Sequence, residues 1–126
     1  MRQKIELEYM LNCSPKAVFA RLSTPEGLSE WFADKVEAAK NIFTFRWDKT
    51  ESKAKLSAIK ENSFVRFEWL EIDDADKNYF EFQISVHELT NDLALIITDF
   101  ADAEEREDAV FLWDTQITEL KRILGV

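Results

Sequence analysis

The chain has 126 residues, enough for one domain with a buried core, and we expect a single domain over residues 1–126. Its formal net charge of −9 disfavours nucleic acids and anionic membrane surfaces as partners, because both present negative phosphates. A single cysteine excludes an intrachain disulfide, and no stretch approaches the roughly 18 apolar residues of a membrane-spanning helix.

The N-terminal segment predicts a strand. Residues 3–12 alternate between apolar and polar side chains, which is the period of a strand with one buried face. The apolar side chains are Ile5, Leu7, Tyr9 and Leu11. Because the segment is interrupted by charges and lacks the apolar run of a secretory signal, we expect a cytoplasmic protein.

Two helix-start signals follow in series. Ser14 precedes a proline, and a serine cap with proline at the first helical position predicts a short helix over about 15–22. Thr24 is followed by a second proline and predicts another short helix, which we expect to run through Trp31 and Phe32. The first two strands are therefore separated by two short helices.

From residue 35 to residue 100 the sequence returns to a period of two. Each segment places aromatic or aliphatic side chains on one face and polar or charged side chains on the other. Short polar turns connect the segments, so we expect antiparallel neighbours. The predicted strands cover residues 35–37, 42–48, 52–60, 63–72, 79–89 and 93–100.

The last segment predicts the one long helix of the chain, over about 101–124. Its apolar residues recur at helical spacing and form one stripe. Asp102 is the predicted N-terminal cap, and Gly125 is the predicted stop. The stripe comprises Ala109, Leu112, Trp113, Ile117, Leu120 and Leu124. The predicted architecture is α+β, a curved antiparallel β-sheet wrapped around this C-terminal α-helix.

Several segments together resemble a known family. The most specific is the motif that spans the second helix start, Thr24-Pro25-Glu26-x-Leu28-x-x-Trp31-Phe32. Further matches are the strands 43–47 and 63–69 and a last helix with Trp113, Leu120 and Leu124 in register. On these residues the whole chain resembles the START-like superfamily, also called Bet v 1-like or SRPBCC, and within it the group named after the activator of the Hsp90 ATPase. The resemblance implies the helix-grip fold.

Two segments of the sequence depart from the pattern of that group. Members commonly carry a Gly-Gly pair before the Phe-x-Phe strand, where this chain has Ala38-Ala39-Lys40-Asn41. A Thr-His pair often ends the last strand, where this chain has Thr98 and Asp99. With only two glycines in the chain, we expect a tightly packed rim around any ligand opening.

The inward face of the predicted sheet suggests a binding function without catalysis. It is aromatic and aliphatic and carries no ionisable group, whereas acid–base or nucleophilic chemistry needs a titratable group at the reacting atom. An apolar pocket with few polar groups suits an apolar small molecule, although the same aromatics can simply fill the core. The predicted cavity-lining residues are Trp31, Phe45, Trp47, Phe67, Trp69, Phe82 and Trp113. The inward polar candidates are Tyr9, Thr98 or Asp99, and Gln116.

Other reactive residues offer no site. Cys13 precedes a helix start, where a thiol pKa can fall, but no histidine lies near it in sequence. His87 falls on the charged face of its strand, and one histidine with one cysteine lacks the usual zinc ligand set. Residues 73–78 are rich in aspartate but lack the glycine and distal glutamate of a calcium loop, so a hairpin turn is expected. We predict no metal and no cofactor.

Three alternatives stay open. The acidic run before the last helix matches the helix dipole, but it also suits docking to a basic protein surface, as in a co-chaperone-like interaction module. That run comprises Asp102, Glu104, Glu105, Glu107 and Asp108. An aromatase/cyclase-type enzyme would need an inward Tyr, Asp or His at a water-accessible pocket. Self-association as a homodimer through an edge strand or the outer helix is also possible.

Overall fold

The computed structural model describes residues 2–72 and 78–126. Within these ranges seven strands, three α-helices and one 3-10 turn follow one another in the predicted order. The elements are β1 (Arg2–Leu11), α1 (Pro15–Ser23), α2 (Pro25–Leu28), β2 (Lys35–Ala39), β3 (Ile42–Trp47), β4 (Thr50–Lys60), β5 (Phe64–Trp69), β6 (Tyr79–Val86), β7 (Leu93–Asp102), the 3-10 turn Ala103–Glu105 and α3 (Arg106–Leu124).

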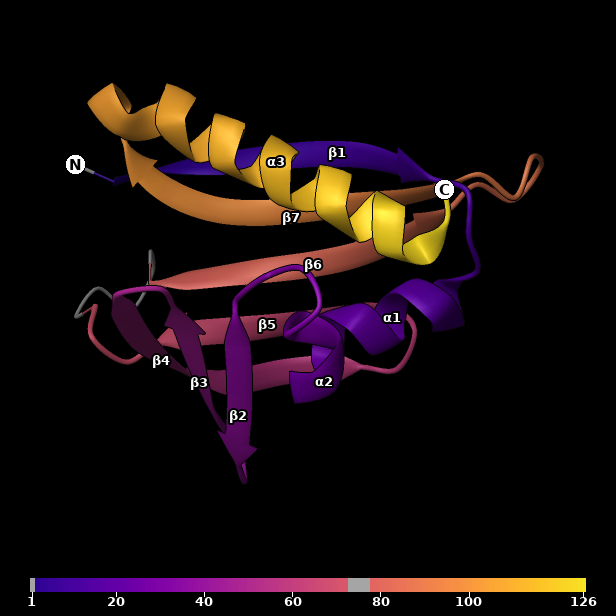
Figure 1. The fold of residues 1–126 in the computed structure, drawn as a ribbon. Coiled ribbons are helices and arrows are strands. Elements are labelled where there is room, and N and C mark those ends of the chain that lie inside the picture. Colours follow the sequence, from indigo (N-terminus) through magenta and orange to yellow (C-terminus); the bar gives the residue numbers. More distant parts are fainter. Residues whose placement is uncertain (1, 73–77) are drawn as a thin grey trace.

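The described strands form one antiparallel sheet in the order β1-β7-β6-β5-β4-β3-β2. Neighbours in the sheet are neighbours in sequence, except that β1 pairs with β7. The helix α3 packs against β1 and β7, and α1 packs against β5 and β6, so the helices share the inner face of the curved sheet (Figure 1). This arrangement confirms the predicted α+β helix-grip architecture with two short helices between β1 and β2.

Both short helices begin where the sequence predicts. The Ser14 hydroxyl accepts a hydrogen bond from the Ala17 N–H at 3.2 Å, and the Thr24 hydroxyl accepts one from the Gly27 N–H at 3.0 Å. The second helix is shorter than expected, because α2 ends at Leu28. The chain then turns, the Asp34 N–H pairs with a carbonyl of β3, and the segment 29–34 passes beneath α3 as a loop.

The start of the last helix differs from the prediction. Asp102 still belongs to β7, where it pairs with Arg2, and its side chain makes no capping hydrogen bond. The 3-10 turn separates this extended backbone from the helix, so a cap at Asp102 is wrong. The predicted stop is confirmed: Gly125 has a φ of 77° and its N–H donates to the Arg122 carbonyl at 3.2 Å.

The buried stripe of α3 is narrower than its sequence suggests. Trp113, Ile117 and Leu120 are buried, whereas Leu112 is 57% exposed and its neighbour Phe111 is 70% exposed. Because α3 rests on the sheet along one line of side chains, residues displaced around its axis remain in contact with solvent. The prediction that Leu112 belongs to the buried stripe of the helix is therefore wrong.

Phe32 fills the centre of the space between α3 and the sheet. Its ring stacks on Phe80 with centroids 5.2 Å apart and on Trp113 at 5.7 Å, and it meets Phe45 edge to face at 5.2 Å. Only 5% of Phe32 is exposed. The loop 29–34 therefore contributes the side chain that closes the core, and the interior beneath it is packed with aromatic rings.

Candidate ligand-binding cleft

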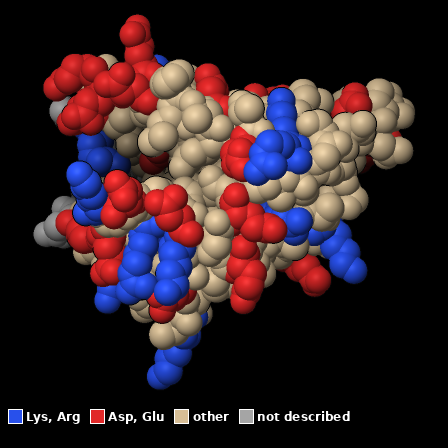
Figure 2. Space-filling model, viewed as in Figure 1, with Lys and Arg blue, Asp and Glu red and all other residues tan. Residues whose placement is uncertain are grey.

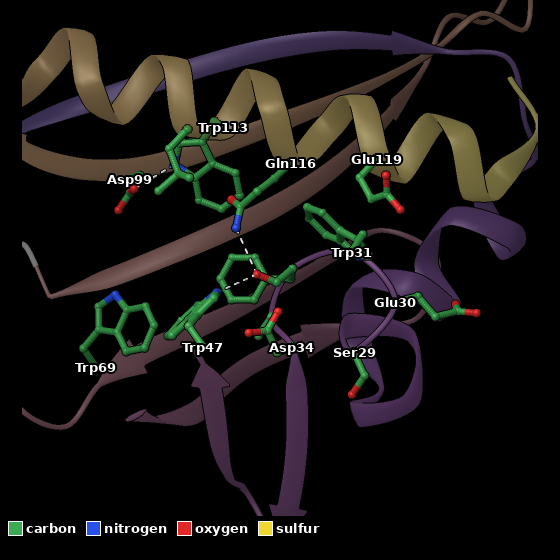
Figure 3. Close-up of a pocket in the computed structure, with 13 residues that line it drawn as sticks. Ser29, Glu30, Trp31, Asp34, Trp47, Trp69, Asp99, Trp113, Gln116 and Glu119 are labelled. Atoms are coloured by element: carbon green, nitrogen blue, oxygen red, sulfur yellow. Dashed lines mark hydrogen bonds between the residues drawn. The ribbon is translucent and has the colours of Figure 1, made fainter. Parts of the chain in front are cut away.

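A cleft of about 740 Å³ opens beside this closed core, between α3, the loop 29–34 and one edge of the sheet. Several lining residues, such as Glu30 and Asp34, are exposed, so the cleft is accessible from solvent. Figure 3 shows the lining side chains in place. They are Ser29, Glu30, Trp31, Phe32, Ala33, Asp34, Trp47, Trp69, Asp99, Leu112, Trp113, Gln116 and Glu119.

Strand direction explains how distant residues meet at this cleft. Because successive strands are antiparallel, β3, β5 and β7 all run the same way, and their C-terminal ends share one edge of the sheet. Trp47 is the last residue of β3, Trp69 is the last of β5, and Asp99 lies near the end of β7. One edge of the meander therefore carries two indoles and a carboxylate toward the helix.

Hydrogen bonds hold three of the tryptophans that line the cleft. The indole N–H of Trp31 donates to the Arg21 carbonyl at 2.8 Å, and that of Trp113 donates to the Asp99 carboxylate at 2.8 Å. The Trp47 indole N–H donates to the Phe32 carbonyl at 3.0 Å. Fixed rings make a preformed apolar wall, which lowers the ordering cost of binding a ligand.

The backbone of Phe32 joins three elements at the cleft. Its carbonyl accepts hydrogen bonds from the Trp47 indole of β3 and from the Gln116 amide of α3, the latter at 2.9 Å. Figure 3 shows both bonds as dashed lines beneath α3. The Phe32 carbonyl oxygen therefore links the loop 29–34 to both the sheet and the helix by hydrogen bonds.

Asp99 is the acid on the inner wall. It follows Leu95 and Ile97 in the strand alternation, so its side chain faces α3. Its carboxylate accepts hydrogen bonds from the Trp113 indole and from the Phe100 N–H, both at 2.8 Å. Burial raises the pKa of the Asp99 carboxyl, and these two bonds with the charge of Arg2 offset part of that rise. Of the two alternatives predicted for the inward polar position in this strand, Thr98 or Asp99, the structure places Asp99 on the cleft, so the inner wall carries an ionisable group there.

The raised pKa of Asp99 predicts a pH dependence of stability. Between its ordinary value of 3.8 and the raised folded-state pKa, the folded protein holds a proton that the unfolded chain does not hold. Stability contributed at this residue therefore falls as pH rises through that window. We expect the free energy of unfolding of the wild type, measured relative to Asp99→Asn by urea denaturation, to increase from pH 7 toward pH 4. The assignment would be contradicted if the difference in the free energy of unfolding, wild type minus Asp99→Asn, stayed constant or became smaller or more negative toward acid.

Three further acids lie at the rim. Glu30 pairs with Arg21 at 2.6 Å, and Glu119 pairs with Arg122 in the next turn of α3. Asp34 stands at the end of the loop 29–34, where its side chain is exposed. Among the described residues that line the cleft there is no Lys, Arg or His. The ionisable groups of the cleft are therefore all carboxylates.

The structure divides the predicted cavity-lining set. All four tryptophans of the chain line the cleft: Trp31, Trp47, Trp69 and Trp113. The remaining three candidates are fully buried beneath it and have no exposed surface: Phe45, Phe67 and Phe82. The sequence interpretation missed Phe32, Asp34 and Glu119 as lining residues. Strand alternation could not predict Phe32 and Asp34, because they lie in a loop. The helical spacing of α3 could not predict Glu119, because this residue lies outside the apolar stripe.

The inward polar candidates lie in different places. Gln116 and Asp99 line the cleft. Tyr9 lies outside it, where its hydroxyl donates to Asp114 at 2.6 Å, and burial together with this bond raises the pKa of Tyr9. Thr98 is buried on the opposite face of β7 from Asp99.

The residues judged unreactive occupy ordinary positions. Burial raises the pKa of the Cys13 thiol, which is the reverse of the shift that activates a nucleophile. His87 follows β6 in an exposed turn, where its ring nitrogen accepts from the Leu89 N–H at 3.3 Å. The described residues hold no group of three His, Cys, Asp or Glu placed to bind a metal ion. Residues 73–77 of the predicted hairpin loop lie outside the described residues.

The predicted acidic partner surface lies at one end of α3. It begins at the end of β7 and continues through the 3-10 turn into the first helical turn. Figure 2 shows these acidic side chains gathered over the start of α3. The set consists of Asp102, Glu104, Glu105, Glu107 and Asp108, and none of them lines the cleft.

Comparison with known proteins places this fold in a family. The chain matches the START-like superfamily domain over residues 1–126 and belongs to that superfamily. BfR322 from Bacteroides fragilis, known from a solution structure, is 41% identical, with 99% of this chain and 93% of that chain covered and a TM-score of 0.70. No curated protein matches the chain.

More distant structures share the fold. The Aha1 dimer from Colwellia psychrerythraea is 16% identical, with 94% of this chain and 93% of that chain covered and a TM-score of 0.78. DynU16, a putative protein in the dynemicin biosynthetic locus, is 12% identical, with 98% of this chain and 47% of that chain covered and a TM-score of 0.80. Among the helices of the described ranges, none is long and apolar enough to cross a membrane.

Proposed function

We propose that this START-like domain binds an apolar small molecule in the tryptophan-lined cleft and does not transform it. The observation that carries the proposal is the cleft itself, about 740 Å³ in volume and walled by every tryptophan of the chain. That volume lies within the range of roughly 300–1,000 Å³ typical of small-molecule sites. Members of the superfamily bind hydrophobic ligands or act in cyclase-type roles, and the first of these roles agrees with this use of the site.

The polar groups of the cleft support binding more than catalysis. The hydroxyl of Ser29 donates to the Pro25 carbonyl at 2.7 Å and accepts from the Val36 N–H at 3.0 Å, so it is engaged in the local fold. Asp99 meets the requirement of a cyclase-type enzyme for an inward acid at an accessible cleft, so that function stays an alternative; both of its oxygens already accept hydrogen bonds, from the Trp113 indole and from a backbone N–H. A nucleophile needs an adjacent base, and among the described lining residues no hydroxyl or thiol has one.

A neutral apolar fluorophore tests the proposal. We expect N-phenyl-1-naphthylamine to bind with one-to-one stoichiometry and a dissociation constant of about 1–100 µM, measured by its fluorescence increase. Trp69→Ala removes one wall of the cleft and should weaken binding about tenfold. Phe111→Ala truncates an aromatic ring of α3 that lies outside the cleft and should leave affinity unchanged.

Two outcomes would count against the cleft as the site. Absence of saturable binding by the folded wild type up to the solubility limit of the probe would overturn the proposal. Equal weakening by Trp69→Ala and Phe111→Ala would place the probe elsewhere on the surface. Far-UV circular dichroism of each variant shows that the comparison concerns folded protein.

A second candidate is a protein-interaction module. Phe111 and Leu112 are exposed next to the acidic run, and a tan, uncharged strip borders the acidic side chains over α3 in Figure 2. The Colwellia relative of similar fold is described as a dimer. Sedimentation velocity over a hundredfold range of concentration tests self-association. A dimer that Phe111→Ser dissociates would favour this role, and a monomer throughout would count against a homodimer.

A further inference from the structure

We infer that the ligand of the cleft is an organic cation, a protonated amine carried on an aromatic or apolar body, with Asp99 as its counter-ion. The inference rests on the proposed function, because it names the charge class of the molecule held in the same cleft. Three features carry it: the sign of the lining charges, the placement of Asp99, and the indoles around it.

The lining charges favour a cation. Glu30, Asp34, Asp99 and Glu119 line the cleft, and no basic side chain is present among its described lining residues. An anionic ligand would meet only like charges there, and like charges across an interface disfavour binding strongly. A neutral ligand can donate a hydrogen bond to one of the carboxylates, but it gains no charge–charge attraction from the four.

The four carboxylates are not equivalent. Arg21 pairs with Glu30 and Arg122 pairs with Glu119, so these two charges are partly neutralised at the rim. Asp34 on the loop and Asp99 on the wall supply the remaining negative field. The negative charge of the cleft therefore comes mainly from Asp34 at the rim and from Asp99 on the wall beside the indoles.

Asp99 retains the capacity to receive an ammonium group. One carboxylate oxygen accepts the Phe100 N–H and the other accepts the Trp113 indole N–H. A carboxylate offers about four acceptor positions, so two positions are available after these bonds. Arg2, whose guanidinium donates to the Phe100 carbonyl at 3.1 Å, lowers the negative potential at Asp99 but is not part of the lining. Burial leaves this carboxylate poorly solvated, and a bound cation would compensate for that loss.

The indoles complete a site suited to an ammonium group on an apolar body. Trp113 donates its indole N–H to Asp99 and stacks one face on Phe32, so it holds the carboxylate in place and does not offer that face to a cation (Figure 3). The face of an indole attracts cations more strongly than the other aromatic side chains do. Trp47 and Trp69 add aromatic surface for the body of the ligand. An amine with an aromatic body therefore satisfies both the charge and the shape of the cleft.

Three naphthalene probes of matched size test the charge class. They are 1-naphthylmethylamine, 1-naphthalenemethanol and 1-naphthoate, which are cationic, neutral and anionic at pH 7. We expect isothermal titration calorimetry to show the amine bound about tenfold more tightly than the alcohol, and the carboxylate most weakly.

Charge-removing variants test the role of Asp99. Asp99→Asn should weaken the amine about tenfold, and should affect the alcohol much less, because only the amine uses the negative charge. Asp34→Asn, an exposed rim change that leaves the core intact, should weaken the amine about threefold. Asp108→Asn makes the same change in net charge on α3 outside the cleft and should alter neither affinity.

The outcomes separate this inference from the proposed function. Alcohol bound as tightly as the amine, or naphthoate bound more tightly, would overturn the cation preference and leave the apolar binding function standing. An amine preference that survives in Asp99→Asn would overturn the assignment of Asp99. Absence of binding by all three probes would overturn the binding function and this inference with it.

Discussion

Replacing Phe32 with alanine is expected to lower the free energy of unfolding by about 3–5 kcal/mol, the range for truncating a buried phenylalanine. The ring lies between α3 and the sheet, stacked on Phe80 and Trp113 and edge to face with Phe45. It comes from a loop, so the surrounding helices and strands have no direct way to close the space that it leaves. Urea denaturation followed by far-UV circular dichroism measures the change.

Phe111→Ala is the matched control for that prediction. It removes the same phenyl group from α3, but Phe111 is exposed, and the free energy of unfolding should change by no more than about 0.5 kcal/mol. Similar losses in the two variants would show that Phe32 does not close the core.

Replacing Gly27 with alanine is expected to destabilise the protein by about 2–3 kcal/mol, near the upper end for overpacking a close contact. A Cβ atom at residue 27 would lie 2.1 Å from the carbonyl oxygen of Ala20 and 2.7 Å from the Cα of Arg21. Both are backbone atoms of α1, so no side-chain rotation relieves the contact. The two short helices would have to separate, and the loop 29–34 that forms the cleft would move with them.

Gly125 provides the comparison within the same chain. A Cβ there meets nothing within 4 Å, and alanine would suffer only the strain of a φ of 77°. Gly125→Ala should therefore cost about 1 kcal/mol, less than Gly27→Ala. Thermal unfolding of both variants side by side measures the difference, and an equal or larger loss at Gly125 would refute the close approach at Gly27.

Most of the fold follows from local pattern. Alternation places Phe43, Phe45 and Val65 on the inner face of their strands, and all three are buried. The serine and threonine caps before the two prolines locate the short helices to within a residue or two. These features are short-range, so sequence alone determines them.

Features that depend on packing between elements are harder to predict from the sequence. The alternation of β4 is interrupted by a register shift between Leu56 and Ala58, and no local signal marks it. The second short helix was predicted to run through Trp31 and Phe32 but ends at Leu28, and the Phe32 carbonyl bonds instead to side chains of β3 and α3, which are distant in sequence. The helical spacing of α3 counts Leu112 as buried, although the width of the contact depends on how the helix sits on the sheet.

The cleft combines both kinds of feature. Its tryptophans were predicted as lining candidates from their alternation and from the motif around Trp31. Asp99 was predicted as one of two alternative inward positions, but Asp34 and Glu119 were not grouped with the tryptophans, since these acids are far apart in sequence and meet only when β7, α3 and the loop are assembled. Recognising that β3, β5 and β7 share a direction would have placed Asp99 beside Trp47 and Trp69.

Nuclear magnetic resonance of the indole N–H groups shows whether the tryptophan-lined cleft is the ligand site. The chain has four such groups, and each belongs to a tryptophan that lines the cleft. Titration with 1-naphthalenemethanol should shift the indole resonances of Trp31, Trp47, Trp69 and Trp113. The amide resonances of the turn at residues 87–91 should stay in place. Unmoved indole resonances during saturable binding would contradict the assignment of the cleft as the ligand site.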